Sequence, residues 1–126
     1  MKLSLLAPAA LLAALGAAAM AAGPAADPIR GKAVFARCAV CHDLNTGTNR
    51  IGPSLKGVMG RKAGTLPGYT YSAAMKAKGV TWNAATLNAY LTNPVGYVPG
   101  NKMPLAPITN PADRANLIAY LAQAAK

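Results

Sequence analysis

Two cysteines and a histidine lie close together in the segment Cys38-Ala39-Val40-Cys41-His42. This is the C-x-x-C-H pattern of c-type haem attachment. One helical turn brings residues i and i+3 to the same face, so both thiols can reach the two vinyl groups of one macrocycle and form thioethers. The adjoining imidazole can then bind the iron. The chain has no other cysteine and no other histidine, so the proximal ligand has a single candidate.

Other uses of the two cysteines explain less of the pattern. In an exported protein, Cys38 and Cys41 could form a disulfide. A thioredoxin-like pair would need a βαβ pattern around it, which this sequence lacks. A zinc site would need two further ligands, and only His42 is at hand. Haem attachment accounts for all three residues together.

The second axial ligand cannot be another histidine, so a methionine thioether is the natural candidate for an electron-carrying haem. Beyond residue 22 the methionines are Met59, Met75 and Met103. Met75 falls in an expected helix, and any methionine can simply fill a core. Met103 lies in a stiff loop between Pro99 and Pro104, which could hold a sulfur in place. The residues alone leave the three in contention.

The first 22 residues have the features of a cleavable secretory signal peptide. Lys2 supplies a positive charge, residues 3–20 are an apolar run, and Ala19-Met20-Ala21-Ala22 is an A-x-A-like cleavage signal. The competing interpretation is an uncleaved membrane anchor, because the run approaches the roughly 20 residues that span a bilayer. We expect cleavage, export to the periplasm and one mature domain over residues 23–126.

The expected mature domain is small and strongly basic. With seven aromatic residues, it has little large apolar surface to bury in a core. A large apolar cofactor would complete that core. Loss of Lys2 with the leader lowers the formal charge from +10 to +9. Such a surface attracts acidic partners in a salt-dependent way. The basic residues are scattered and no helix-turn-helix, RNP-like or zinc-finger pattern accompanies them, so no nucleic acid is expected.

Helix signals predict an all-α chain of several short helices and long loops. The cap-plus-proline pairs Asp27-Pro28 and Asn110-Pro111 begin a helix that ends at the attachment site and a C-terminal helix that runs to about residue 124. Gly31 lies in the middle of the first helix, where it costs about 1 kcal/mol relative to Ala. Close approach of another helix would justify that cost.

Shorter helices are expected between these two. Ser72 caps a helix stopped by Gly79, Asn83 caps one that ends at Asn93, and Pro94 can open a further one. Residues 43–66 and 98–107 are predicted loops, the first with one helical turn around residues 55–59. No strand of convincing length is present.

Eight motifs follow one another along residues 23–126, and their order is far more specific than any one of them. They are Gly31-x-x-x-Phe35-x-x-Cys38-x-x-Cys41-His42, Gly52-Pro53-Ser54-Leu55-x-Gly57, Gly60-Arg61-Lys62-x-Gly64, Pro67-Gly68-Tyr69-x-Tyr71, Lys78-Gly79-Val80-x-Trp82, Tyr90-Leu91-x-Asn93-Pro94, Tyr97-Val98-Pro99-Gly100-x-Lys102-Met103 and Leu117-Ile118-x-Tyr120-Leu121. In this order they resemble class I cytochromes c, specifically the mitochondrial type and its bacterial periplasmic relatives. The resemblance implies a cytochrome c fold, with loops wrapped around one covalently bound haem.

The resemblance also implies a ligand set. Met103 matches the family's distal ligand, so His42 and Met103 would bind the iron. Pro53 matches the residue whose carbonyl accepts the imidazole N–H, a contact that fixes the ring. Tyr90 matches the phenol near the methionine sulfur. We also expect Asn101, in the same loop as Met103, to be one of the haem-binding residues.

Two further groups of residues are implied by the resemblance. Arg61, Tyr71 and Trp82 match residues that hold a buried haem propionate, which would be costly to bury unpaired. Gly31 and Phe35 match positions at which the N-terminal helix crosses the C-terminal one. The chain departs from the mitochondrial type at Met75, in place of an asparagine near the haem, at Leu105, in place of an aromatic residue, and at Asp43.

The expected function is single-electron transfer by a monomeric, exported carrier with one haem c, and not catalysis. Its partners would be acidic faces of an oxidase, a reductase or a reaction centre. Lysines are the candidate docking residues: Lys32, Lys56, Lys62, Lys76, Lys78 and Lys102. One alternative to an electron carrier is a peroxidase, which would need an open coordination position at the iron. Another is a binding protein, either a gas sensor or the haem subunit of a larger complex. Rapid binding of carbon monoxide to the ferrous protein would favour these alternatives.

Overall fold

A computed structural model describes residues 25–126, so the expected signal peptide lies outside the described residues. These residues form five α-helices and no β-strand, apart from one isolated antiparallel bridge between Lys62 and Thr81. The all-α prediction is therefore confirmed. No helix within residues 25–126 is both long and apolar enough to cross a membrane.

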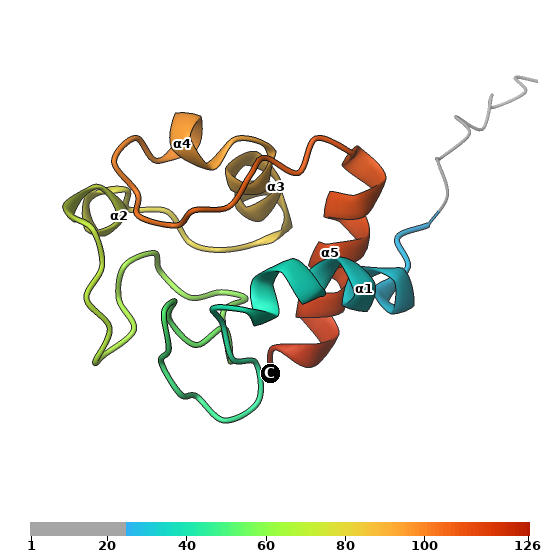
Figure 1. The fold of residues 1–126 in the computed structure, drawn as a ribbon, viewed down its shortest axis with the longest axis horizontal. Coiled ribbons are helices and arrows are strands. Elements are labelled where there is room, and N and C mark those ends of the chain that lie inside the picture. Colours follow the sequence, from blue (N-terminus) through green and yellow to red (C-terminus); the bar gives the residue numbers. More distant parts are fainter. Residues whose placement is uncertain (1–24) are drawn as a thin grey trace, which may run out of the picture.

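The two terminal helices, α1 (Pro28–Ala39) and α5 (Pro111–Ala124), pack against each other at one end of the molecule (Figure 1). Both begin as predicted, with Asp27 and Asn110 as N-caps. A Cβ atom at Gly31 would lie 1.9 Å from the carbonyl oxygen of Asn116. Only glycine lets the backbones approach this closely, which is the expected reason for Gly31 in mid-helix.

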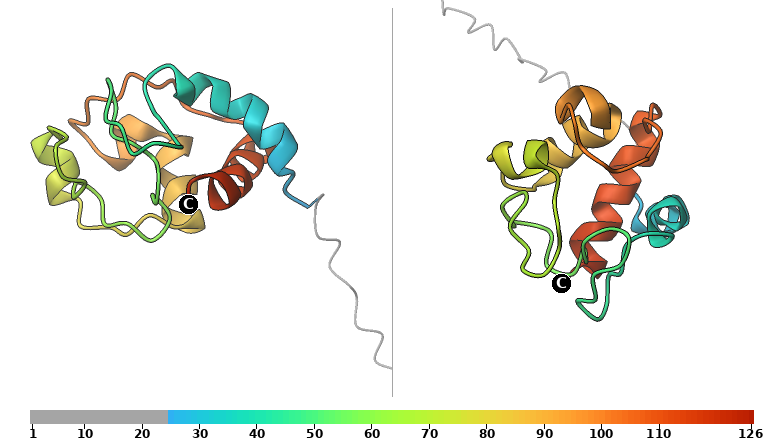
Figure 2. Two further views of the ribbon diagram at one scale, coloured as in Figure 1. Left: turned by 90° about the horizontal axis from the view of Figure 1, so that it is seen from below. Right: turned by 60° about the vertical axis from the view of Figure 1, so that its left-hand side comes forward.

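Three short helices occupy the middle of the chain: α2 (Ala73–Ala77), α3 (Ala84–Thr92) and α4 (Pro94–Tyr97). Ser72 caps α2 and Asn83 caps α3, as predicted. Asn93 ends α3 and its side chain caps α4 through the Gly96 N–H. Both views in Figure 2 place α2 opposite the α1–α5 pair, with long loops between these two ends.

The helical turn predicted around residues 55–59 is wrong. Two consecutive reverse turns occupy this stretch, with Val58 N–H donating to Leu55 O at 3.0 Å and Arg61 N–H to Val58 O at 3.0 Å. Gly57 and Gly60 have φ angles of +73° and +87°, which are left-handed and take the backbone out of the helical conformation. The rest of residues 43–66 is loop, as expected.

Candidate functional site

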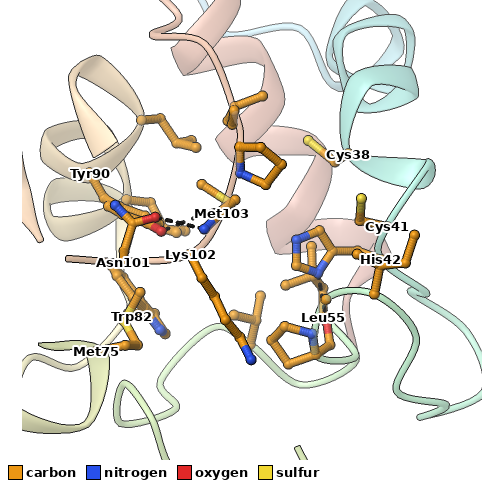
Figure 3. A pocket seen from close by; sticks show the side chains of 18 of the residues that line it. Cys38, Cys41, His42, Leu55, Met75, Trp82, Tyr90, Asn101, Lys102 and Met103 are labelled. Atoms are coloured by element: carbon orange, nitrogen blue, oxygen red, sulfur yellow. Dashed lines mark hydrogen bonds between the residues drawn. The ribbon is translucent and has the colours of Figure 1, made fainter. Parts of the chain in front are cut away.

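One cavity of about 360 Å³ lies between the α1–α5 end and the α2–α3 end of the molecule. Its lining is mainly apolar and draws on α1, α2, α3, α5 and the loops between them. A cavity of this size and character is typical of a ligand or cofactor site. Figure 3 shows the two cysteines and His42 on one side of it, and Tyr90, Asn101 and Met103 on the other. We refer to these as the His42 wall and the Met103 wall.

Both cysteines of the attachment pattern line this cavity. Cys38 lies in the last turn of α1 and Cys41 just beyond it; both are half-buried and neither is in a disulfide. Burial raises the pKa of Cys38 to about 11, so its thiol is protonated at neutral pH. Among residues 25–126, no three His, Cys, Asp or Glu side chains cluster as a metal site. The disulfide and zinc alternatives therefore lack support.

His42 is held in the orientation that a metal ligand needs. Its Nδ1 lies 2.7 Å from the carbonyl oxygen of Pro53. A carbonyl oxygen only accepts, so Nδ1 carries the proton and Nε2 keeps a free lone pair. Burial lowers the pKa of His42, and the charges of Arg61 and Arg50 lower it further, whereas the Pro53 contact raises it. The ring is therefore neutral at pH 7 and able to bind a metal through Nε2.

The backbone of Gly52 lies directly against the His42 ring, with no room for a side chain. A Cβ atom at this position would lie 2.4 Å from Cε1 and 2.7 Å from Nδ1 of His42. The Gly52 N–H also donates to the Cys41 carbonyl at 2.9 Å. The motif Gly52-Pro53 thus supports both the attachment turn and the imidazole, which gives its glycine a steric role that the sequence did not reveal.

Met103 lies on the opposite wall, supported mainly by Asn101. The Asn101 side chain accepts from the Met103 N–H at 2.8 Å and donates to the carbonyls of Pro94 and Val98, each at 3.0 Å. The Tyr90 hydroxyl lies 3.9 Å from Met103 Sδ. Burial raises the pKa of Tyr90 to about 12, so its hydroxyl stays protonated and can donate to the sulfur.

The other methionines are placed less favourably for binding a metal beside His42. Met75 lines the cavity, but Figure 3 shows it farther from His42 than Met103 and next to Trp82. Met59 borders a separate surface groove between α5 and the start of α3. Of the three candidates, Met103 has its sulfur across the cavity from the imidazole.

The three residues that the resemblance assigns to a propionate do not lie together on the cavity. Trp82 and Tyr71 line it, and Trp82 stacks on Tyr90 with a centroid distance of 5.2 Å. Arg61 is half-buried and does not line the cavity; its guanidinium donates to the carbonyls of Ser54 at 2.8 Å and Lys56 at 3.4 Å. Within residues 25–126 the only ion pair joins Arg30 and Asp27, so no acidic side chain neutralises Arg61.

A group of contacts ties three loops together near the Met103 wall. The Lys102 ammonium donates to the Thr70 carbonyl and lies 4.8 Å from the centre of the Tyr69 ring. The Tyr69 hydroxyl in turn donates to the Ile51 carbonyl at 2.9 Å. These contacts, which we call the Lys102 strap, link the Met103 loop to the loops before α2 and after the attachment turn.

The residues present fit a covalently bound haem. The cavity is apolar, two free thiols and a neutral imidazole lie at one side, and an unneutralised guanidinium lies close by. These are the groups that an apolar macrocycle with an iron centre and anionic side chains requires. Fold and site together define a c-type cytochrome with one haem.

Comparison with known proteins agrees with this assignment to the c-type cytochromes. The sequence profile of the family Cytochrome c matches residues 29–125. Cytochrome c2 of Rhodomicrobium vannielii is 49% identical over 107 residues, covering 84% of this chain and 83% of that protein. Cytochrome c2 of Rhodoblastus acidophilus is also 49% identical, over 79% of this chain and 94% of that protein. The solved structure of cytochrome cH from Methylobacterium extorquens superposes with a TM-score of 0.73 at 42% identity, covering 77% of this chain and 98% of that chain.

The chain belongs to the cytochrome c family. It is accordingly an electron-transfer protein whose haem c is attached through Cys38 and Cys41. Both the predicted fold and the predicted cofactor are confirmed.

Proposed function

We propose that this chain is a periplasmic single-electron carrier whose iron is bound by His42 and Met103. The supporting observation is that the neutral imidazole and the thioether face each other across one apolar cavity. Haem c supplies the chemistry, a one-electron change at its iron. The cysteine attachment and family membership support the electron-transfer role, and the ligand pair specifies how this chain performs it.

The residues around the cavity would keep the site unchanged as an electron enters or leaves. Pro53 and Gly52 fix the His42 ring, and Asn101 fixes the backbone at Met103. Little rearrangement of ligands is then needed, which favours fast transfer. A thioether ligand and an apolar surrounding both disfavour the extra positive charge of ferric iron, so the potential would be high.

Carbon monoxide binding to the ferrous protein tests this closed site. If Met103 occupies the sixth position, the untreated protein should bind carbon monoxide slowly, because the thioether must leave first. Rapid binding at neutral pH would favour an enzyme or gas-sensor role instead and would contradict the proposal. Slow binding that stays slow in Met103→Ala would assign the blocking group to another residue.

The proposed location depends on the first 22 residues. Their positive start, apolar run and cleavage signal are typical of a signal peptide, and c-type haem attachment suits export. Mass spectrometry of the protein isolated separately from the soluble and membrane fractions of its native cells tests this directly. An N-terminus near residue 23 is expected, and a retained apolar segment would show the membrane-anchored alternative.

We also propose that the protein acts as a monomer that docks on acidic faces of redox partners. The formal charge of +9 that is expected after loss of the first 22 residues supports this, since long-range attraction speeds encounter. Raising the ionic strength from about 10 mM to 150 mM should lower the second-order rate of electron transfer about tenfold or more, because the Debye length falls from about 30 to 8 Å. A rate that does not change with salt would contradict docking by charge.

A further inference from the structure

The backbone of the attachment turn receives its hydrogen bonds from one short segment of the following loop. At the end of α1, the carbonyls of Ala39 and Val40 have no helical N–H ahead of them to accept from. The Arg50 guanidinium donates to both, with Nη1 at 3.0 Å from Ala39 O and Nη2 at 3.2 Å from Val40 O. These are the two residues between the haem-binding cysteines.

The contacts between the attachment turn and the loop continue in chain order along both segments. After Arg50, the Gly52 N–H donates to the Cys41 carbonyl at 2.9 Å. The Pro53 carbonyl then accepts from Nδ1 of His42 at 2.7 Å. Segment 50–53 therefore supports every residue of the attachment turn after Cys38, and Arg50 provides the first part of that support through its side chain alone.

Arginine suits this position for two separate reasons. Its planar fork of donors can contact two neighbouring carbonyls at once, which the point charge of a lysine ammonium does not do in a fixed geometry. Its positive charge also lies at the C-terminal end of α1, where the helix dipole favours a cation.

We propose that Arg50 is a positioning residue for electron transfer, which holds the attachment turn through its guanidinium and favours the ferrous iron through its charge. A cation held on the turn that ends at His42 opposes the gain of positive charge on oxidation, and Arg50 is exposed, so salt should weaken this part of its effect. The role of the charge rests on the proposed ligation by His42. The hydrogen bonds to Ala39 and Val40 do not depend on any iron ligand.

Two variants separate the fork from the charge. Arg50→Lys keeps the charge and loses the fork, whereas Arg50→Gln loses both. Lys32→Gln removes an exposed charge from α1 about 10 Å further along the helix and serves as the control. The haem-loaded protein is used throughout, with the midpoint potential and the amide exchange rates of Cys41, His42 and Gly52 as the two measurements.

We expect Arg50→Gln to lower the midpoint potential by at least three times as much as Lys32→Gln at low salt, and Arg50→Lys to leave it near the native value. Both Arg50 variants should speed exchange of the three amides about fivefold, and Lys32→Gln should not. A potential that responds equally to Arg50→Gln and Lys32→Gln would overturn the charge effect. Unchanged exchange in both Arg50 variants would overturn the positioning role. Failure of His42 ligation would instead be seen in the ferric optical spectrum of the native protein.

Discussion

The two walls of the cavity are built by different means. The His42 wall follows directly from α1, and each residue of the attachment turn after Cys38 contacts the nearby segment 50–53. The Met103 wall is an extended loop, and its support comes mainly from side chains: Asn101, the Tyr90 hydroxyl and the Lys102 strap. The comparison indicates that the imidazole side is rigid because of local backbone contacts, whereas the thioether side depends on a few side chains and is the weaker of the two.

The largest effect is expected from crowding the rigid wall. In Gly52→Ala, the new Cβ would meet the His42 ring at 2.4 Å, while the Pro53 carbonyl holds that ring through Nδ1. The free energy of unfolding of the haem-loaded protein should fall by about 3 kcal/mol in urea titrations, because neither partner can move freely. A fall no larger than that of Gly57→Ala would contradict a rigid His42 wall.

Gly57→Ala is a suitable control for this experiment. Gly57 has a φ of +73°, and a Cβ atom added there would meet nothing within 4 Å. An alanine at this position adds only left-handed strain, which costs about 1 kcal/mol. The difference between the two variants therefore isolates the steric contact with His42.

A smaller but more selective effect is expected on the weaker wall. Asn101→Ala removes three hydrogen bonds that hold the Met103 loop, with an expected cost of about 2 kcal/mol. If the variant loses this free energy only in the form in which Met103 blocks the iron, carbon monoxide should bind the ferrous protein about 30-fold faster, as measured by stopped flow. Asn45→Ala, in an exposed loop, should leave the rate unchanged. Equal rates in both variants would mean that Asn101 does not hold the Met103 loop in the closed form of the site.

The smallest of the three effects concerns the Lys102 strap. Lys102→Ala removes the contact with the Tyr69 ring, worth about 0.5–1 kcal/mol at an exposed site. Carbon monoxide binding should then be about two- to fivefold faster than in the native protein. Lys76→Ala removes an exposed lysine from α2 and provides the comparison. No difference between these variants would show that the weaker wall does not need the strap.

The sequence revealed the His42 wall and the helices better than the Met103 wall. Caps such as Asp27-Pro28 and Asn83 act within a few residues, so the helices could be placed from local chemistry. The turn at residues 55–59 was mistaken for helix because its two glycines adopt positive φ angles, which composition does not specify.

The site shows the same division. The spacing of Cys38, Cys41 and His42 was enough for the attachment turn, whereas Met103 could be chosen among three methionines only through the family resemblance. The contacts of Arg50 with Ala39 and of Lys102 with Thr70 join residues 11 and 32 positions apart. Both lie in loops without periodicity, so no sequence pattern could have predicted them.

X-ray absorption at the iron edge of the ferric protein tests the central claim most directly, because it detects a sulfur bound to iron without relying on activity. The native protein should show a sulfur neighbour in addition to nitrogen neighbours, and Met103→Ala should lose it and have a lower midpoint potential. A sulfur neighbour that persists in Met103→Ala, as Met75 could supply from the same cavity, would contradict the assignment. So would a native protein with no sulfur at the iron.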